Sequence, residues 1–465
     1  MAGRAAAALA PLSAHHGTAL PGYLADQVDP TLLASYRERL GPVVLVIGAN
    51  GKTTTTRLIA GILERATGSP VVTNRSGANL RQGILTALLT DRHVGNARPA
   101  AVIEVDELAF RTVARDLRPT VVVILNLLRD QLDRYGEIDV VAGRWREDLA
   151  EMPPGAALVI CADDPRVEAL ADSTRRSYRF GLAIDPGAGA SGRPASTVET
   201  IGSGPDPAPC PRCGSPVETR GAAVSGLGPW RCPACGLERG RPDVEVRIGQ
   251  ADRSGWLCLG FDGPLVRGPS SPPPDEVRVR LSGSAAAYDA GAAVLAAIAL
   301  GVEPRKAIAS VDQATPAFGR LEEITVDDRH VVLSLAKNPA SLAEAAHAAA
   351  TRRPDGLLIG LADRPADGRD VSWIWDAPLE ELVDLAPTTL TGSRADDLAL
   401  RLKYARGAQG VRQRPHVEIA IESAFDGALR RVAPGGTLMV LGTYTALLGV
   451  RAVLERRGLA PALPR

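Results

Sequence analysis

The sequence has 465 residues, with 53 basic and 53 acidic side chains and a formal net charge of zero. This length exceeds what one small core needs, so two or three domains are expected. The balanced charge, with no basic tail or stripe, argues against nucleic acid as a partner. No apolar stretch approaches the ~18–20 residues that a membrane span requires. We therefore expect a cytoplasmic protein with at most peripheral contact to the inner face of the membrane.

The first 40 residues are expected to form a leader that is partly disordered. They begin with the alanine-rich run MAGRAAAALAPLSAHHG. The alternative is a signal peptide, which would require a longer apolar core and a cleavage site.

Apolar, β-branched segments alternate with helical segments between residues 41 and 316, where we expect a first, central domain. Such strands, buried on both sides, predict an α/β fold with a parallel sheet covered by helices on both faces. The predicted strands are 43–48, 100–107, 120–128 and 155–165, and the predicted helices include 53–66 and 283–302.

The same alternation restarts near Phe318 and predicts a second, Rossmann-like α/β domain over residues 317–465. Residues 186–245 are expected to be an insert in the first domain. This insert consists of a linker rich in Gly, Ser and Pro and a cysteine module at 208–238. The strands predicted for the second domain are 330–336, 355–363, 386–393 and 435–446.

Residues 43–61, VVLVIGANGKTTTTRLIAG, contain a strand, a glycine turn, a lysine and a helix. The strict P-loop pattern fails because Val46 stands where its first glycine is required. The remaining glycines still allow backbone N–H groups to surround phosphate oxygens at a helix N-terminus. Lys52 is expected to reach the β- and γ-phosphates, and Thr53 to bind Mg²⁺. The alternative is a glycine turn capped by threonines. The expected nucleotide-binding residues here are Gly48, Asn50, Gly51, Lys52, Thr53 and Thr54.

A magnesium site also requires an acid, and Glu104 ends the predicted strand AVIEV. Ligands of open α/β sheets bind at the carboxyl ends of the strands, which favours Glu104 over an exposed acidic loop. Only four of the 53 basic residues are lysines. A lysine inside a motif therefore indicates that a compact, flexible ammonium group is required there.

Four cysteines form two CxxC pairs, and each pair is followed by glycine. This spacing predicts a tetrahedral zinc site with four thiolate ligands, which leaves no position for a reactive water and is therefore structural. Two disulfides are the alternative, and a cytoplasmic compartment opposes them. The predicted zinc ligands are Cys210, Cys213, Cys232 and Cys235.

Several of these motifs together resemble the Mur ligases, which form amide bonds through an acyl phosphate made from ATP. The motifs are GANGKTT, EVDE, NLLRDQLDRYGE (126–137), ADDP (162–165) and FGRLEE (318–323). Within this family, NRSGAN (74–79), the cysteine module and DGRDVSWIWD (367–376) are similar to the ligase-like MurT subunits of lipid II isoglutaminyl synthase. The resemblance implies that ATP drives amidation of the D-glutamate α-carboxylate in the lipid II stem peptide. The product would be D-isoglutamine.

The resemblance also assigns roles to residues outside the P-loop. It implies that Arg320 faces the nucleotide phosphates. Lys337 stands where many Mur ligases have a histidine, which makes it a candidate catalytic residue; the alternative is a surface lysine. Gln131 replaces the histidine of a common motif, and Asp289 replaces an asparagine that contacts adenine. No lysine lies between positions 52 and 306, so a carbamylated lysine is not available.

Ammonia release from glutamine requires a nucleophilic cysteine with a histidine base. Cys161 and Cys258 lie in apolar strands, and the six histidines form no recognisable glutaminase motif with them. The resemblance implies a GatD-like glutaminase subunit as partner, and implies that this chain supplies the acid of the partner's triad. Asp370 is the first candidate, with Asp367 and Asp376; the alternative is that Asp370 caps the segment VSWIWD.

Two other functions remain as alternatives. One is a different Mur-fold amide ligase, of the amino-acid-adding or folylpolyglutamate type, which the missing carbamyl-lysine and the cysteine module oppose. The other is a non-catalytic nucleotide-binding scaffold that uses a zinc ribbon for protein contacts.

Overall fold

The structure is a computed structural model. It describes residues 19–74, 78–94, 98–130, 137–153, 155–171, 175–183, 208–219, 227–249, 256–267, 276–281, 283, 285–313, 318–405 and 414–461. Gln131 and most of the predicted linker lie outside the described residues. Within the described part of the chain, no helix combines the length and the hydropathy that crossing a membrane requires.

The first domain is built on a nine-stranded sheet whose strands are almost continuously buried. Seven strands, from β2 to β9 in spatial order, run parallel, as the sequence predicted. The last two strands pair antiparallel and extend the sheet beyond the prediction. In spatial order the strands are β2 (Val72–Thr73), β3 (Ala101–Glu104), β1 (Val43–Ile47), β4 (Val121–Ile124), β5 (Ala157–Cys161), β6 (Ser177–Leu182), β9 (Val244–Ile248), β10 (Leu257–Asp262) and β11 (Val277–Val279).

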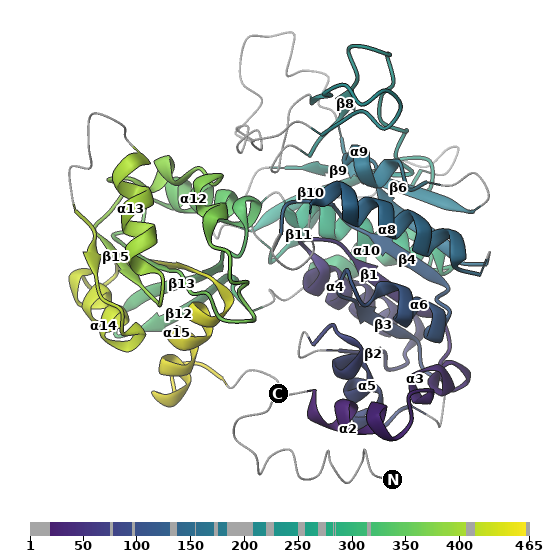
Figure 1. Ribbon diagram of the computed structural model, residues 1–465, viewed down its shortest axis with the longest axis horizontal. Helices are drawn as coiled ribbons and strands as arrows, with labels where there is room; N and C mark the ends of the chain where they lie inside the picture. Colours follow the sequence, from purple (N-terminus) through teal and green to yellow (C-terminus); the bar gives the residue numbers. More distant parts are fainter. Residues whose placement is uncertain are drawn as a thin grey trace.

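Helices cover both faces of this sheet, because its strands are apolar on both sides. Helices α4 and α10 pack together on one face, and α6, α8 and α9 lie on the other (Figure 1). The helices of this domain are α2 (Leu20–Val28), α3 (Leu32–Ser35), η2 (Tyr36–Arg39), α4 (Lys52–Thr67), α5 (Arg81–Thr90), α6 (Phe110–Leu117), α8 (Ile138–Glu151), α9 (Pro165–Glu168), α10 (Ala285–Ala299), α11 (Pro304–Ala309) and η3 (Ser310–Gln313).

Part of the expected leader is ordered. Residues 20–39 form helices α2, α3 and η2, and these pack on α5 and α6 of the first domain. Leu33, Tyr36 and Leu40 are buried in the same core as the central sheet. The sequence did not reveal this packing because it joins a short segment to helices α5 and α6, which follow much later in the chain. Residues 1–18 lie outside the described part of the chain.

The second domain is a separate α/β unit, drawn in green and yellow in Figure 1. Its sheet is parallel except for the first strand, which pairs antiparallel with the second. In spatial order the strands are β12 (Arg320–Val326), β13 (Arg329–Leu335), β17 (Thr437–Gly442), β14 (Gly356–Gly360), β15 (Thr388–Thr391) and β16 (His416–Val417). The helices are α12 (Pro339–Arg352), η4 (Ser372–Trp375), η5 (Leu379–Leu382), α13 (Ala395–Ala405), α14 (Ile421–Arg431) and α15 (Tyr444–Arg456).

Helices also cover both faces of the second sheet. Helices α12 and α13 pack on one face and α14 and α15 on the other, which gives this domain two hydrophobic clusters of its own. The cysteine module contains a small two-stranded sheet, β7 (Glu218–Thr219) and β8 (Trp230–Arg231), and projects from the first domain beside β9 (Figure 1).

Candidate functional site

The predicted phosphate loop joins strand β1, an interior strand of the first sheet, to helix α4. Gly48 has a φ of 142° and Gly51 a φ of 91°, a region of backbone conformation that favours glycine. A Cβ on Gly51 would lie 2.1 Å from Asp289 Oδ1, so a side chain is also excluded by packing. The loop therefore places its backbone N–H groups and the N-terminus of α4 at one point at the carboxyl end of the sheet.

Lys52, the first residue of α4, is only 7% exposed. Its Nζ donates to Gly48 O at 2.5 Å and to Glu107 Oε1 at 2.5 Å. Burial opposes the charged form, but Glu107, Glu104 and Asp130 raise the pKa of Lys52 above its usual value. Burial likewise opposes the ionised form of Glu107, yet Lys52 lowers the pKa of that carboxyl. The lysine is thus held as a cation at the mouth of the loop.

Thr53 and Glu104, the two residues expected to bind Mg²⁺, lie in contact. Thr53 Oγ1 donates to Glu104 Oε2 at 2.7 Å. Glu104 ends strand β3 and is fixed there by Asn74, whose side chain donates to Glu104 O and accepts from Glu104 N. Asn79 Nδ2 donates to the other carboxylate oxygen at 3.3 Å. A hydroxyl and a carboxylate in this position are the oxygen ligands that Mg²⁺ prefers.

The conformation of the loop is also fixed by Asn126, at the end of β4. The backbone N–H of Asn50 donates to Asn126 Oδ1 at 2.9 Å, and Asn126 Nδ2 donates to Asn50 O at 3.1 Å. Thr54, the residue that follows Thr53, is buried. Sequence reasoning did not assign a role to Asn126, although it lies in the motif NLLRDQLDRYGE.

The second domain contacts this loop directly through the segment between β13 and α12. Lys337 Nζ donates to Ala49 O at 3.1 Å and forms an ion pair with Asp130. Asn338, which caps α12, exchanges side-chain hydrogen bonds with Asn50 at 3.0 and 3.4 Å. Lys337 is therefore not an isolated surface lysine at the end of a strand, because it lies against the phosphate loop.

Asp289 lies under the loop rather than at its mouth. Its Oδ1 accepts from Thr55 Oγ1 at 3.2 Å. Burial raises the pKa of Asp289 to about 7, although Arg320 and Thr55 act in the opposite direction. The carboxylate of Glu344, in α12, accepts a hydrogen bond from the backbone N–H of Ala285 at the start of α10. Burial raises the pKa of Glu344, and Arg320 acts in the opposite direction. Arg320 therefore acts on the buried carboxyl group of Asp289 and on the half-buried carboxyl group of Glu344, at the boundary between the domains.

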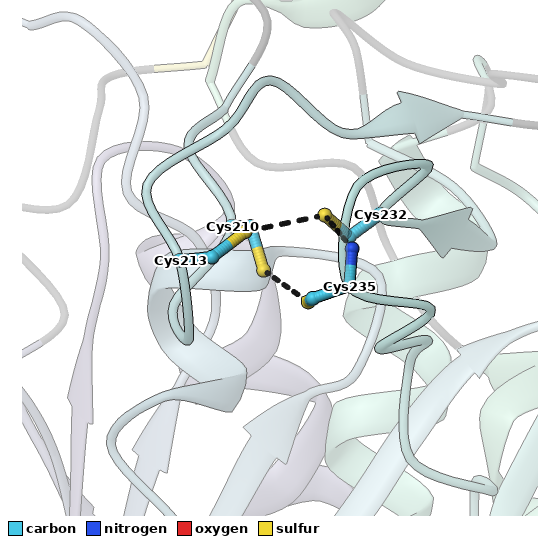
Figure 2. A group of neighbouring side chains, drawn as sticks. All are labelled: Cys210, Cys213, Cys232 and Cys235. Atoms are coloured by element: carbon cyan, nitrogen blue, oxygen red, sulfur yellow. Dashed lines mark hydrogen bonds between the residues drawn. The ribbon is translucent and has the colours of Figure 1, made fainter.

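The four cysteines of the module converge, as Figure 2 shows. Cys210 Sγ lies 3.6 Å from Cys235 Sγ, and Cys213 Sγ lies 3.5 Å from Cys232 Sγ. All four sulfur atoms lie within 4.8 Å of one another. Four Zn–S bonds of ~2.3 Å in a tetrahedron place the sulfur atoms about 3.8 Å apart, so these residues fit a zinc ion.

The environment of the thiols also favours a dication. Backbone and side-chain hydrogen bonds from Ser215, the largest influence, lower the pKa of Cys213 to about 6. The Leu237 N–H favours the thiolate of Cys235, but burial and the neighbouring cysteines raise its pKa to about 11. Several thiolates cannot share this small space unless a cation offsets their repulsion.

Asp163, the first aspartate of ADDP, joins the cysteine module to the central sheet. It is fully buried, forms an ion pair with Arg239 and accepts from Tyr288 Oη at 2.9 Å. Trp230 of β8 donates its indole N–H to Ala162 O at 2.9 Å. The module is therefore anchored to the domain that carries the phosphate loop, a role that the sequence did not indicate.

The three candidate triad aspartates have different environments. Asp367 is buried and accepts from Thr445 N at 2.8 Å and Arg364 N at 3.2 Å, so it caps α15 and fixes a turn. Asp376 is exposed and pairs with Arg129 of the first domain at 3.1 Å. Asp370 is exposed and accepts from the backbone and hydroxyl of Ser372 at 2.8 and 3.0 Å.

Aromatic side chains accompany these aspartates. Trp373 packs against the core of the second domain. Trp375 is 49% exposed, lies 6.3 Å from Tyr404 between ring centroids, and stacks under Arg401. Exposed tryptophan and tyrosine beside a charged side chain are typical of protein interfaces.

Cys161 is fully buried in β5, where burial, with Asp163 and Asp164, raises the pKa of its thiol. Such a thiol is a poor nucleophile. Cys258 is half-buried in β10.

Two family descriptions match the chain: "Mur ligase middle domain" over residues 46–188 and "MurT ligase C-terminal" over residues 335–447. A protein of Staphylococcus aureus (strain COL) named lipid II isoglutaminyl synthase (glutamine-hydrolyzing) subunit MurT is 30% identical over 95% of this chain and 93% of its own length. Its namesake from Streptococcus pneumoniae is 29% identical over the same shares of the two chains.

Solved structures show the same architecture. A pseudomurein peptide ligase type C from Methanothermus fervidus has a TM-score of 0.65, with 20% identity, over 90% of this chain and 79% of its own. MurF ligase from Thermotoga maritima in complex with ADP has a TM-score of 0.60, with 15% identity, over 92% of this chain and 84% of its own.

The chain has two α/β domains that meet at a GxxGKT loop, and it is similar in structure to the ligases just named. These features define the Mur ligase fold. Within this fold, 30% sequence identity over 95% of the chain assigns the protein to one family. The chain belongs to the MurT family.

Proposed function

We propose that this chain is the ligase subunit of a glutamine-hydrolysing lipid II isoglutaminyl synthase. It would use ATP to convert the D-glutamate α-carboxylate of the stem peptide into an acyl phosphate, which ammonia converts to D-isoglutamine. The observation that carries the proposal is the meeting of Lys52 and Lys337, from two domains, at one phosphate loop. Membership of the MurT family supports the choice of substrate.

The reaction brings a carboxylate to the γ-phosphate, so two anions must approach each other. Lys52 would bind the terminal phosphates and Lys337 would offset the charge that develops between the reacting groups. Thr53 and Glu104 would hold Mg²⁺, which supplies further neutralisation of the phosphate charge. Gly48, Asn50, Gly51 and Thr54 would shape the loop around the phosphates, and Arg320 would face them from the second domain.

Ammonia would come from a GatD-like partner. We propose that Asp370 completes that partner's cysteine–histidine pair, because a third group must orient the imidazole. Asp370 is exposed and accepts from neighbouring Ser372, in the segment that carries Trp375, whereas Asp367 is buried and accepts from two backbone N–H groups. The four cysteines would hold a structural zinc ion. The complex would work in the cytoplasm, at the inner face of the membrane that carries the substrate.

The test is an amidation assay with the chain, its glutaminase partner, lipid II, ATP and glutamine. Mass spectrometry should show one carboxyl of the stem peptide converted to a carboxamide, with ADP and phosphate formed. Lys52→Ala should abolish ATP turnover, while Lys306→Ala, a change at an exposed lysine of α11, should not. ATP turnover that is independent of lipid II, or turnover that Lys52→Ala leaves normal, would contradict the proposal.

A further inference from the structure

Asp130 lies at the boundary between the two domains, six residues beyond the end of strand β4. One oxygen, Oδ2, accepts a hydrogen bond from Lys337 Nζ, and the side chain is only 7% exposed. The other oxygen, Oδ1, is buried and has no hydrogen-bond partner within the described structure. A buried carboxylate oxygen without a donor costs free energy, so this position calls for a functional reason.

The surroundings of Asp130 define what Oδ1 can accept. Its charge acts on Lys52 and raises the pKa of that lysine, which places Asp130 near the mouth of the phosphate loop. Lys337 connects it to Ala49 of the same loop. An anionic group, such as a phosphate or the substrate carboxylate, would be repelled by Oδ1. A group with N–H donors would be attracted to it.

We infer that Asp130 is the residue that receives ammonia in the second half-reaction, an inference that rests on the proposed function. Oδ1 accepts an N–H of the ammonia molecule and directs the nitrogen lone pair at the acyl carbon. The C–N bond then forms, and the bond between that carbon and the phosphate oxygen breaks. Phosphate leaves with the electron pair, and the proton released by nitrogen passes to Oδ1 and from there to phosphate or solvent.

Lys337 and Asp130 then have complementary tasks in successive steps. The ammonium group of Lys337 compensates negative charge while the acyl phosphate forms. Its ion pair with Oδ2 also fixes the orientation of the carboxylate, so that Oδ1 is presented to the incoming nucleophile. A water molecule in the same place would be a weaker nucleophile than ammonia, so binding of ammonia there protects the acyl phosphate from hydrolysis.

The test separates the two half-reactions in the complete complex. Formation of the acyl phosphate is measured without glutamine or ammonium, as positional isotope exchange in ATP labelled with heavy oxygen. Amidation is measured with an ammonium salt, which bypasses the glutaminase. The variant is Asp130→Asn, because asparagine keeps an oxygen acceptor for Lys337 but cannot take up a proton. The matched control is Asp139→Asn, which changes an exposed aspartate paired with Arg166.

Asp130→Asn should lower amidation by about 100-fold, within the range for loss of a general base, and raise the KM for ammonium, while isotope exchange persists. Asp139→Asn should retain both activities. Parallel loss of exchange and amidation in Asp130→Asn would overturn the inference, since the residue would then act only through Lys337 and the ATP site. Unchanged amidation would overturn it as well. Absence of exchange in the wild-type complex would instead refute the acyl-phosphate function on which the inference depends.

Discussion

Lys337 of the second domain donates a hydrogen bond to the carbonyl oxygen of Ala49, in the phosphate loop of the first domain, across 3.1 Å. The two residues are 288 positions apart in the sequence. The contact places an ammonium group from one domain beside the phosphate loop of the other. In the proposed reaction, this juxtaposition brings a second cation to the place where two anions approach each other.

Replacing Lys337 by glutamine should therefore impair chemistry more than nucleotide binding. Glutamine retains a donor for Ala49 but lacks the charge that offsets the approach of two anions. We expect the rate of ATP-dependent amidation to fall by about 100- to 1,000-fold, the range observed when one transition-state donor is removed. ATP affinity, measured by calorimetry, should change little. Lys403→Gln, at an exposed residue of α13, is the control; a large loss of ATP affinity in Lys337→Gln would assign the lysine to binding.

The cysteine module should contain one zinc ion per chain, since four thiolates fill one tetrahedral site. Cys232→Ser should lower the melting temperature and the zinc content together, because the module is anchored to the sheet through Trp230 and Arg239. Cys258→Ser, which changes a cysteine outside the module, should keep the zinc. Protein with no zinc and with the four cysteines present as disulfides would contradict this prediction.

The two α/β domains could be predicted from the sequence because their signals are local. Apolar strands, the glycine turn and the CxxC pairs each depend on neighbouring residues. Strands and a helix form where the apolar runs and the glycine turn predicted them, and the four cysteines lie close together. The contacts that complete the site join residues far apart in the chain. The pairing of Lys52 with Glu107, the hydrogen bonds between Asn126 and Asn50, and the pair of Lys337 with Asp130 all depend on tertiary packing.

The antiparallel edge of the first sheet was missed for a related reason. Strands β9, β10 and β11 are short, are only partly buried and follow a long polar insert, so their pairing could not be inferred from apolar runs.

Asp370→Asn should strongly reduce hydrolysis of glutamine by the complex, because the histidine of the partner would lose the group that orients it. Loss of a triad acid has cost about 10,000-fold in a related arrangement, which sets the upper limit of the effect. Amidation with ammonium salts should persist, since the ATP site lies elsewhere. Asp139→Asn, at an exposed aspartate of the first domain, is the control. Asp376→Asn tests the other exposed candidate, which forms an ion pair with Arg129. Wild-type glutaminase activity in Asp370→Asn would exclude this residue from the triad.

The buried carboxyl of Asp289 should make the stability of the protein depend on pH. Its pKa is raised to about 7 from a usual value of 3.8, because burial disfavours the charged form. Between these values the folded protein retains a proton that the unfolded chain has released. The free energy of unfolding therefore falls as the pH rises through this interval, and this contribution becomes constant above about pH 7.

Asp289→Asn removes this loss of stability at higher pH, because asparagine cannot ionise. It keeps an oxygen acceptor for the hydroxyl of Thr55. The variant should melt several degrees above the wild type at about pH 8, and the difference should shrink as the pH approaches about 5. The measurement is a series of thermal unfolding curves over this pH range, with Asp139→Asn as an exposed control. A variant that is less stable than the wild type at every pH would show that the charge of Asp289, held by Arg320, stabilises the contact between the domains.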